Sequence, residues 1–320
     1  MNVLFADTTH PALPTLLSEA GFVVDEGKCT NKEACLAIIN RYDGIIIRSK
    51  FIIDRPFLDK ATNLKFIGRV GAGMENIDTE YAQQRGVLCF NSPEGNRDAV
   101  GEQTVGMLLM LQNNLLRANS EVKNGIWKRE ENRGVEIGGK TIGIIGFGNM
   151  GSTVAKKLRG FDMRILAYDK YKTNYAPDYV TETSLEKLYK ESDIVSMHVP
   201  LTEETHYMCN TDFFNAFQKP IVFINTARGK VLQTSALVYA MEQGKVFGAC
   251  LDVLEYEAVS FENIYRDKLP DDFQYLCNSE RVILSPHIAG WTHESNIKLS
   301  SLLAKKIIDA FGQDPLNKRS

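Results

Sequence analysis

The residues best suited to chemistry are an arginine and a histidine that each follow a short apolar run. Arg228 follows the run VFIN, and its guanidinium could bind a carboxylate through two parallel hydrogen bonds and polarise a neighbouring carbonyl. His287 follows VILSP, and a neutral imidazole could take a proton from a hydroxyl group and return it. Such a ring needs a carboxylate to orient it, and Glu257 is the candidate. A surface arginine that caps a sheet and a buried core histidine are the structural alternatives.

The glycine-rich segment GFGNMG predicts a dinucleotide site, because it follows the strand-like run TIGII and precedes the helical pattern STVAKKLRG. Gly146 permits a tight turn, Gly148 lets a pyrophosphate approach the backbone, and Gly151 allows close helix–strand packing. Asp169 ends the next predicted strand, where a carboxylate binds a ribose diol and repels a 2′-phosphate. We therefore expect NAD rather than NADP. A structural glycine turn beside an unrelated aspartate is the alternative.

These residues are positioned by a regular alternation of elements. Short β-branched runs alternate with helical patterns along nearly the whole chain, which predicts parallel strands buried on both faces. Residues 1–92 already contain a small doubly wound domain, residues 98–125 predict one long helix, and a second series of strands begins near residue 140. The predicted fold class is α/β with two doubly wound parallel-sheet domains. Ligands bind beyond the carboxyl ends of such strands. Residues at predicted strand ends are Pro200, Thr226, Arg228, Asp252 and His287.

The composition is that of an ordinary globular protein with two domains. The chain has 320 residues, of which 44% are apolar and 24% are charged. The net charge of −3 gives no attraction to nucleic acid or anionic lipid, and no run is long and apolar enough to span a bilayer. The N-terminus lacks a signal-peptide pattern, and the six cysteines form no CxxC pair. We therefore expect a cytoplasmic protein with reduced thiols, a small-molecule substrate and no metal site.

The sequence resembles the D-isomer-specific 2-hydroxyacid dehydrogenases over nearly its full length. The motifs that carry the resemblance are, in family order, GRVGAGMENID (68–78), GFGNMG, Asp169, HVPLTEETHYM (198–208), NTARG (225–229), LDVLEYE (251–257) and SPHIAGWT (285–292). The resemblance implies that Arg228 binds the carboxylate and carbonyl of the substrate, that His287 is the acid and base, and that Glu257 pairs with it. It implies an NAD site lined by Gly146, Gly148, Asn149, Met150, Gly151, Asp169, Pro200, Thr226, Ala227, Asp252 and Gly290.

By the same resemblance, a Rossmann-like NAD-binding domain is inserted in a flavodoxin-like substrate domain. The expected boundaries are 95–288 for the NAD-binding domain, and 1–94 with 289–320 for the discontinuous substrate domain. Members of the family are usually dimers whose NAD-binding domains exchange long helices, which suits residues 98–125, so we expect a homodimer. Lys128 and Arg129 resemble the family's segment that can reach the neighbouring subunit's site.

Within the family, the sequence is most similar to the phosphoglycerate dehydrogenases. These carry a basic cluster after the third strand, which here reads Arg48-Ser49-Lys50, and two cations there could hold a phosphate. A solvated basic turn is the alternative. The resemblance also places Gly71, Ala72 and Gly73 at the substrate. It implies oxidation of 3-phospho-D-glycerate to 3-phosphohydroxypyruvate, the entry to serine biosynthesis. The alternatives are a glyoxylate/hydroxypyruvate reductase, an erythronate-4-phosphate dehydrogenase and, more remotely, an NAD(H)-sensing protein similar to the co-repressors of this fold.

The sequence departs from the family pattern in three places. Ala258 follows Glu257 where the family usually has proline, and the span from Glu257 to His287 contains an insertion at about residues 258–278. The chain ends soon after the last predicted helix, so we expect no regulatory ACT domain and no serine feedback through one.

Overall fold

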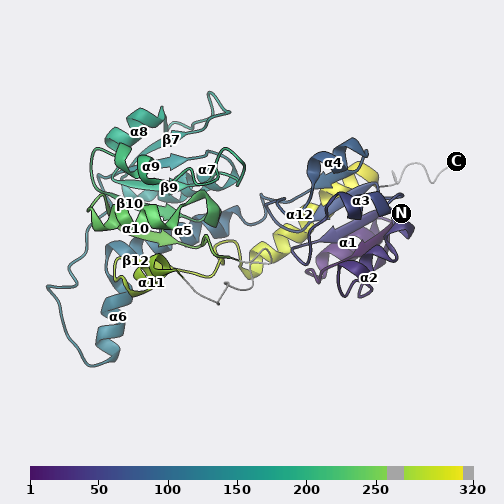
Figure 1. The fold of residues 1–320 in the computed structure, drawn as a ribbon, viewed down its shortest axis with the longest axis horizontal. Coiled ribbons are helices and arrows are strands. Elements are labelled where there is room, and N and C mark those ends of the chain that lie inside the picture. The colour runs from purple at the N-terminus through teal and green to yellow at the C-terminus, as the bar shows by residue number, and fades with distance from the viewer. Residues whose placement is uncertain (258–269, 313–320) are drawn as a thin grey trace. The chain divides into compact units, whose positions relative to one another are not determined.

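The protein is described by a computed structural model that covers residues 1–257 and 270–312. The chain forms two compact units, which are coloured by residue number in Figure 1. Unit 1 contains Met1–Asn96 and the described residues from Trp291 onward. Unit 2 contains Arg97–Glu257 and the described residues 270–290. Each unit has one parallel sheet covered by helices, so the predicted α/β fold class is confirmed.

Unit 1 is a five-stranded parallel sheet in the order β2-β1-β3-β4-β5, the flavodoxin-like order. Its elements are β1 (Asn2–Phe5), α1 (Ala12–Glu19), β2 (Val23–Asp25), α2 (Lys32–Leu36), the 3₁₀ turn Ile39–Arg41, β3 (Gly44–Ile47), α3 (Arg55–Lys60), β4 (Phe66–Arg69), α4 (Thr79–Gln84), β5 (Leu88–Phe90) and α12 (His293–Phe311). Successive side chains of β1, and of Ala6 directly after it, enter opposite cores, because side chains alternate along an extended chain. Val3 and Phe5 pack with α1 and α12, whereas Leu4 and Ala6 pack with α2, α3 and α4.

Unit 2 is a seven-stranded parallel sheet in the order β12-β11-β10-β9-β6-β7-β8. Its elements are α5 (Arg97–Gln112), α6 (Leu115–Lys123), β6 (Thr141–Ile145), α7 (Asn149–Leu158), the 3₁₀ turn Arg159–Phe161, β7 (Arg164–Tyr168), β8 (Thr181–Glu182), α8 (Leu185–Glu191), β9 (Ile194–Met197), α9 (Thr211–Ala216), β10 (Ile221–Asn225), the 3₁₀ turn Gly229–Val231, α10 (Thr234–Glu242), β11 (Val246–Leu251), α11 (Asp271–Asn278) and β12 (Val282–Leu284). One core includes side chains of α5 and α7, and the other includes side chains of α9, α10 and α11. The order is that of a Rossmann sheet with one further strand.

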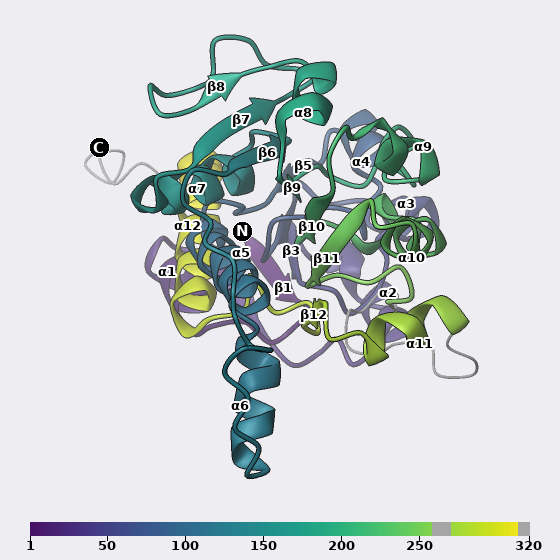
Figure 2. The same cartoon turned by 90° about the vertical axis from the view of Figure 1, so that its left-hand side faces the viewer.

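The one long helix expected over 98–125 is instead two helices, α5 and α6. The chain breaks at Asn114, which has a left-handed backbone at φ 51°. Asparagine tolerates this conformation and commonly ends helices. The break divides the predicted apolar stripe, since Leu108 and Leu111 are buried whereas Leu115 and Leu116 are exposed. Figure 2 shows α6 extending away from the sheet of its own unit.

The expectation that all six cysteines are reduced is wrong for two of them, because Cys29 and Cys35 form a disulfide. The side chain of Asn31 caps the start of α2 and turns the chain back, so that the two Cα atoms lie 4.9 Å apart. This separation is within the range that a disulfide requires. Cys209 and Cys250 are buried free thiols, and burial raises the pKa of both. Thiols in such surroundings are unreactive.

The structure also bears on the expected absence of a membrane span and on the insertion at about residues 258–278. No helix within 1–257 or 270–312 is both long and apolar enough to cross a membrane. Of the insertion noted in the sequence, residues 258–269 lie outside the described part of the chain, and its remaining residues are Pro270 and the whole of α11.

Candidate active site

The candidate acid and base, His287, lies directly beside its predicted carboxylate. Its Nδ1 atom is 2.7 Å from Oε2 of Glu257, and both side chains are largely buried. The backbone amide of Leu254 donates a hydrogen bond to Oε1 of Glu257, which fixes the carboxylate. A histidine held at Nδ1 by a carboxylate is oriented to exchange protons through Nε2, and its protonated form is stabilised.

The backbone at His287 has a conformation that only a fixed loop maintains. Its φ is 55°, in the left-handed region, which costs a non-glycine residue about 1–3 kcal/mol. Asp252, at the end of β11, accepts hydrogen bonds from the amides of Ile288 and Ala289, each at 2.9 Å. Its backbone carbonyl accepts from the amide of His287 at 2.7 Å. The buried Asp252 carboxylate therefore holds the loop that carries the candidate base.

Arg228 lies in a tight turn after β10. Asn225 stabilises the turn, since its Nδ2 donates to the carbonyl of Arg228 at 3.0 Å and its Oδ1 accepts from the amide of Ala227 at 3.0 Å. Nη1 of Arg228 donates to the carbonyl of Ala227 at 2.7 Å. Gly229 is required here, because an added Cβ would lie 1.9 Å from the carbonyl oxygen of Leu254. This packing places the arginine turn against the segment that leads to Glu257.

The sheet order brings the predicted strand-end residues to one edge of unit 2. The strands β12, β11, β10, β9, β6 and β7 are consecutive neighbours and parallel, so their carboxyl ends share that edge. The residues that follow these strands are His287 and Gly290 after β12, Asp252 after β11, Thr226, Ala227 and Arg228 after β10, Pro200 after β9, the Gly146–Gly151 segment after β6, and Asp169 after β7.

Three polar residues that support this edge were not predicted. The hydroxyl of Ser285 donates to Oδ1 of Asp252 at 2.6 Å and is itself contacted by Nε2 of Gln103 at 3.3 Å. Thr104, buried in α5, is 3.2 Å from the hydroxyl of Thr226. Gln103 and Thr104 thus connect α5 to two of the strand-end loops. The sequence offered one signal for Gln103 and Thr104, since they are two consecutive polar residues beside the apolar stripe of the helix predicted over residues 98–125.

The glycine loop has the geometry that a dinucleotide requires. Gly146 has φ 90°, and an added Cβ would lie 2.5 Å from the carbonyl oxygen of His198. A Cβ at Gly151 would lie 2.1 Å from the carbonyl oxygen of Gly146, so close packing demands glycine there. At Gly148 no atom of the described chain would contact an added Cβ, which leaves open space beside the backbone.

The helix that follows the loop begins at Asn149 and Met150. Gly148 is its N-cap, and none of the described side chains caps this end of α7. Uncapped amides and the helix dipole favour a phosphate at such an end. Asp169 joins the loop, because its Oδ2 accepts from the amide of Phe147 at 2.9 Å. The residues present therefore fit a pyrophosphate and ribose.

The basic cluster of unit 1 lies after β3, beside β1, where the strand order of this sheet reverses. Asp7, which the sequence analysis missed, organises the cluster. Its Oδ2 accepts hydrogen bonds from the amides of Arg48, Ser49 and Lys50, at 2.6, 3.1 and 3.2 Å. Asp7 lies two residues after the end of β1, and an aspartate directly after an apolar run was the signal for it. The amides of this loop therefore already bind an anionic group of the protein.

The two cations of the cluster have different surroundings. Arg48 stacks on Trp291, with its guanidinium carbon 4.6 Å from the ring centroid, and its Nη1 donates to the carbonyl of Thr8 at 3.5 Å. Stacking uses the face of a guanidinium and leaves its edges for hydrogen bonds. The ammonium of Lys50 instead donates to the backbone carbonyls of Ala6 and, at 2.9 Å, Cys29. Arg48 is thus the better placed of the two to meet an anion.

The glycines assigned to the substrate by resemblance follow β4 in unit 1. Gly71 has φ 150°, which a side chain rarely permits, and its carbonyl accepts from the amide of Ser92 at 3.0 Å. The carbonyl of Ala72 accepts from Nδ2 of Asn91 at 2.6 Å. Gly73 follows in the same irregular segment. These contacts tie the loop to the segment that follows β5.

Comparison with known proteins identifies a family. The model of the D-isomer specific 2-hydroxyacid dehydrogenase NAD-binding domain matches residues 105–289. A hydroxypyruvate reductase of Thermotoga maritima is 35% identical over 283 residues, which is 88% of this chain and 89% of the relative. A D-3-phosphoglycerate dehydrogenase of Archaeoglobus fulgidus is 31% identical over 97% of this chain. The chain spans only 57% of the length of that relative.

Solved structures agree with this match. The crystal structure of a D-lactate dehydrogenase from Aquifex aeolicus, complexed with NAD and lactic acid, has a TM-score of 0.84 and 31% sequence identity to the present chain. The alignment covers 99% of this chain and 97% of that one. The similarity therefore extends over both units.

Proposed function

Because the chain belongs to the D-isomer specific 2-hydroxyacid dehydrogenases, a family of NAD-dependent enzymes that act on hydroxyl donors, we propose that it oxidises 3-phospho-D-glycerate at C2 to 3-phosphohydroxypyruvate. The observation that carries the acid–base part of the proposal is the contact of 2.7 Å between His287 and Glu257, at the sheet edge that holds the glycine loop. The cytoplasmic location and the place in serine biosynthesis stay predictions.

NAD, when bound, supplies the acceptor for the hydride that leaves C2. The loop from Gly146 to Gly151 would hold its pyrophosphate, and Asp169 its ribose. His287 takes the proton of the C2 hydroxyl, so that the C–O bond becomes a carbonyl, and it returns the proton in the reverse reaction. Glu257 stabilises the charged ring. Arg228 binds the carboxylate of the acid and polarises the carbonyl that forms.

Arg48 supports a substrate that carries a terminal phosphate. Its stacking on Trp291 uses the face of the guanidinium, and on its edges Nη1 donates one long hydrogen bond, of 3.5 Å, to the carbonyl of Thr8. Arg48 is partly exposed at the carboxyl end of β3, where α/β sheets bind ligands. We propose that it binds the phosphate, while Lys50 stabilises the loop.

A second candidate is the reduction of hydroxypyruvate or glyoxylate. One observation favours it, since the ammonium of Lys50 is engaged by two backbone carbonyls and the cluster then offers one cation rather than two. A relative named hydroxypyruvate reductase also matches nearly its whole length. An acid without a phosphate does not need the basic cluster, because Arg228 would bind its carboxylate and His287 would exchange its proton.

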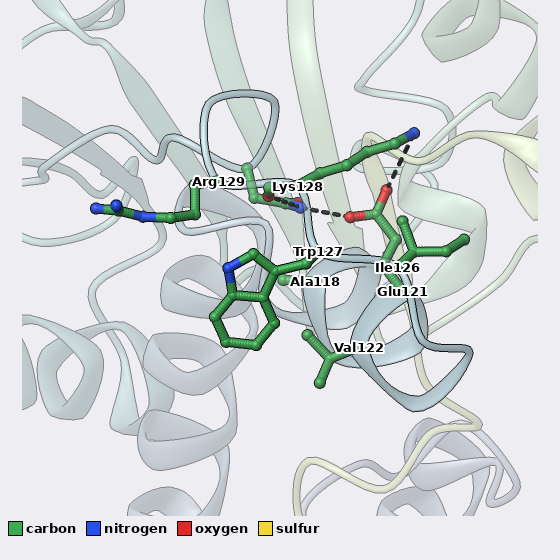
Figure 3. Close-up of a pocket in the computed structure, with 8 residues that line it drawn as sticks. Ala118, Glu121, Val122, Ile126, Trp127, Lys128 and Arg129 are labelled. Atoms are coloured by element: carbon green, nitrogen blue, oxygen red, sulfur yellow. Dashed lines mark hydrogen bonds and ion pairs between the residues drawn. The ribbon is translucent and has the colours of Figure 1, made fainter.

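We also propose that the chain forms a homodimer through α6. Leu115, Leu116, Val122, Ile126 and Trp127 are exposed on α6 and the segment after it, and Trp127 is 77% exposed. Figure 3 shows Trp127 and Val122 on the surface of a pocket that Glu121 and Lys128 border. Contiguous exposed apolar residues of this kind mark interfaces. Val122→Asp should give a monomer in light scattering, whereas Val23→Asp, at an exposed valine of unit 1, should leave the dimer intact.

The function is tested by steady-state oxidation of NADH with a panel of 2-keto acids, with and without a terminal phosphate. The proposal predicts the highest kcat/KM for 3-phosphohydroxypyruvate. A preference for hydroxypyruvate or glyoxylate would select the second candidate. Tight binding of NADH without turnover of any acid would contradict both and indicate a cofactor-sensing protein.

A further inference from the structure

Two lysines lie beside the aspartate that selects NAD. Lys170 follows Asp169 directly and Lys172 lies three residues after it, at the end of β7, the strand whose end faces the adenosine ribose in Rossmann folds. A cation near this position normally accommodates the 2′-phosphate of NADP. The expected preference for NAD therefore requires that these lysines be unable to meet a phosphate.

Both ammonium groups are engaged by other parts of unit 2. Lys170 forms an ion pair with Oε1 of Glu204, which lies in the segment after β9. The ammonium of Lys172 donates to the carbonyl oxygen of Phe147, within the glycine loop, at 2.9 Å. Neither lysine side chain is therefore directed only to solvent.

Glu204 binds a second group of the same segment. Its Oε2 accepts a hydrogen bond from the hydroxyl of Tyr171, so one carboxylate holds two consecutive residues after Asp169. These hydrogen bonds, first that of Lys170, lower the pKa of Glu204, which keeps it charged. Because Glu204 contacts the two residues that follow Asp169, its negative charge would also repel a 2′-phosphate at this strand end.

Asp169 also has a structural role in the loop. Its Oδ1 accepts from the amide of Tyr171 at 3.0 Å, and its Oδ2 accepts from the amide of Phe147 at 2.9 Å. The carboxylate is thus part of the loop structure as well as a ribose ligand. Removing it would disturb the glycine loop and would leave Lys170 paired with Glu204.

We propose that Glu204 is a second residue that determines cofactor specificity, because it withholds Lys170 from a 2′-phosphate and adds repulsion against it. This inference rests on the proposed NAD site. It predicts that the chain already contains the cation needed for NADP and keeps it paired.

The test measures dissociation constants for NADH and NADPH by fluorescence titration, which requires no substrate. Glu204→Gln should tighten NADPH binding about tenfold, because a freed lysine gains a charge-assisted contact with phosphate, and should change NADH binding less than threefold. The exposed neighbour Glu203 is the matched control, since Glu203→Gln removes the same charge one residue away. It should change neither constant by more than about twofold.

A second variant separates the released lysine from the general charge effect. Lys170→Met, added to Glu204→Gln, should abolish most of the gain in NADPH affinity. Equal gains for Glu203→Gln and Glu204→Gln, or a gain that survives Lys170→Met, would overturn the inference alone. If the wild-type chain binds neither cofactor, the proposed function fails with it.

Discussion

His287 in unit 2 and Lys50 in unit 1 both follow a buried strand, and both were predicted to act on the substrate, yet their surroundings differ. His287 contacts a carboxylate, Glu257, which supports the charge that the ring would acquire. Lys50 contacts backbone carbonyls that use its donors for structure. The comparison teaches that a strand end locates a functional side chain, whereas its partners decide whether the side chain is available.

The largest expected effect comes from removing the acid and base. His287→Asn should lower kcat by about 10²- to 10⁴-fold, because the hydroxyl proton then has no acceptor in the protein. NADH binding should change less than threefold, since the glycine loop is untouched. Stopped-flow formation of NADH and a cofactor titration measure the two quantities. Turnover close to that of the wild type would remove His287 from the mechanism.

The comparison becomes sharper when Arg48 and Lys50, the two cations of the basic cluster, are replaced separately. Arg48→Ala should lower kcat/KM for a phosphorylated acid by about 10- to 150-fold, the effect of one charge-assisted contact of about 1.5–3 kcal/mol. Lys50→Ala should change it about threefold or less, and should act mainly on the urea midpoint of unfolding, because its ammonium binds structural carbonyls. If Lys50→Ala has the larger kinetic effect, our assignment of the two cations is reversed.

A second histidine of unit 2, His198, lies in different surroundings from His287. His198 is buried, its Nε2 is 2.8 Å from the hydroxyl of Ser196, and its Nδ1 has no partner among the described residues. Burial lowers the pKa of His198 to about 4, so the folded protein disfavours its charged form.

As the pH falls below the ordinary pKa, near 6.5, the unfolded chain therefore binds a proton at His198 that the folded protein does not bind, so the stability of the folded protein falls until the pH reaches about 4. Between pH 7 and pH 4.5 we expect the wild type to lose about 2–3 kcal/mol more than His198→Gln in the free energy of unfolding. Urea unfolding at both pH values measures this difference. Parallel losses in the two proteins would show that His198 is not the group responsible.

The smallest expected effect concerns the indole that supports Arg48. Trp291→Leu should raise KM for a phosphorylated acid about three- to tenfold with kcat nearly unchanged, because a cation–π contact contributes about 0.5–1 kcal/mol at exposed sites and more when desolvated. Trp291→Phe should restore most of the affinity. The chain has two tryptophans, so Trp127→Phe leaves Trp291 as a single fluorescent probe. Its emission should change when a phosphorylated acid binds, and an unchanged emission would place the phosphate elsewhere.

Much of the fold and of unit 2 could be predicted from the sequence. Alternating apolar runs gave parallel strands, and the rule that ligands bind at their carboxyl ends located Arg228, Asp252 and His287 on one edge. The glycines of the loop were recognisable because close backbone contacts at Gly146 and Gly151 exclude any side chain. These features depend on local sequence or on element order alone.

The features that could not be predicted depend on contacts between distant residues. The partners of the basic cluster are Asp7, Ala6, Cys29 and Trp291, and no local pattern links them to residues 48–50. The break at Asn114 was missed because apolar periodicity continues through it, although the paired asparagines were a signal. The disulfide likewise depends on the turn that Asn31 imposes before α2.

The central claim is that residues of unit 2 set the rate for every acid, whereas Arg48 sets only which acid is preferred. The ratio of kcat/KM for 3-phospho-D-glycerate to kcat/KM for D-glycerate tests it most directly, measured in the wild type, Arg48→Ala and His287→Asn. We predict that Arg48→Ala lowers the ratio by at least about tenfold, and that His287→Asn lowers both constants and leaves the ratio within about threefold. An unchanged ratio in Arg48→Ala, or a ratio that collapses in His287→Asn, would contradict the account.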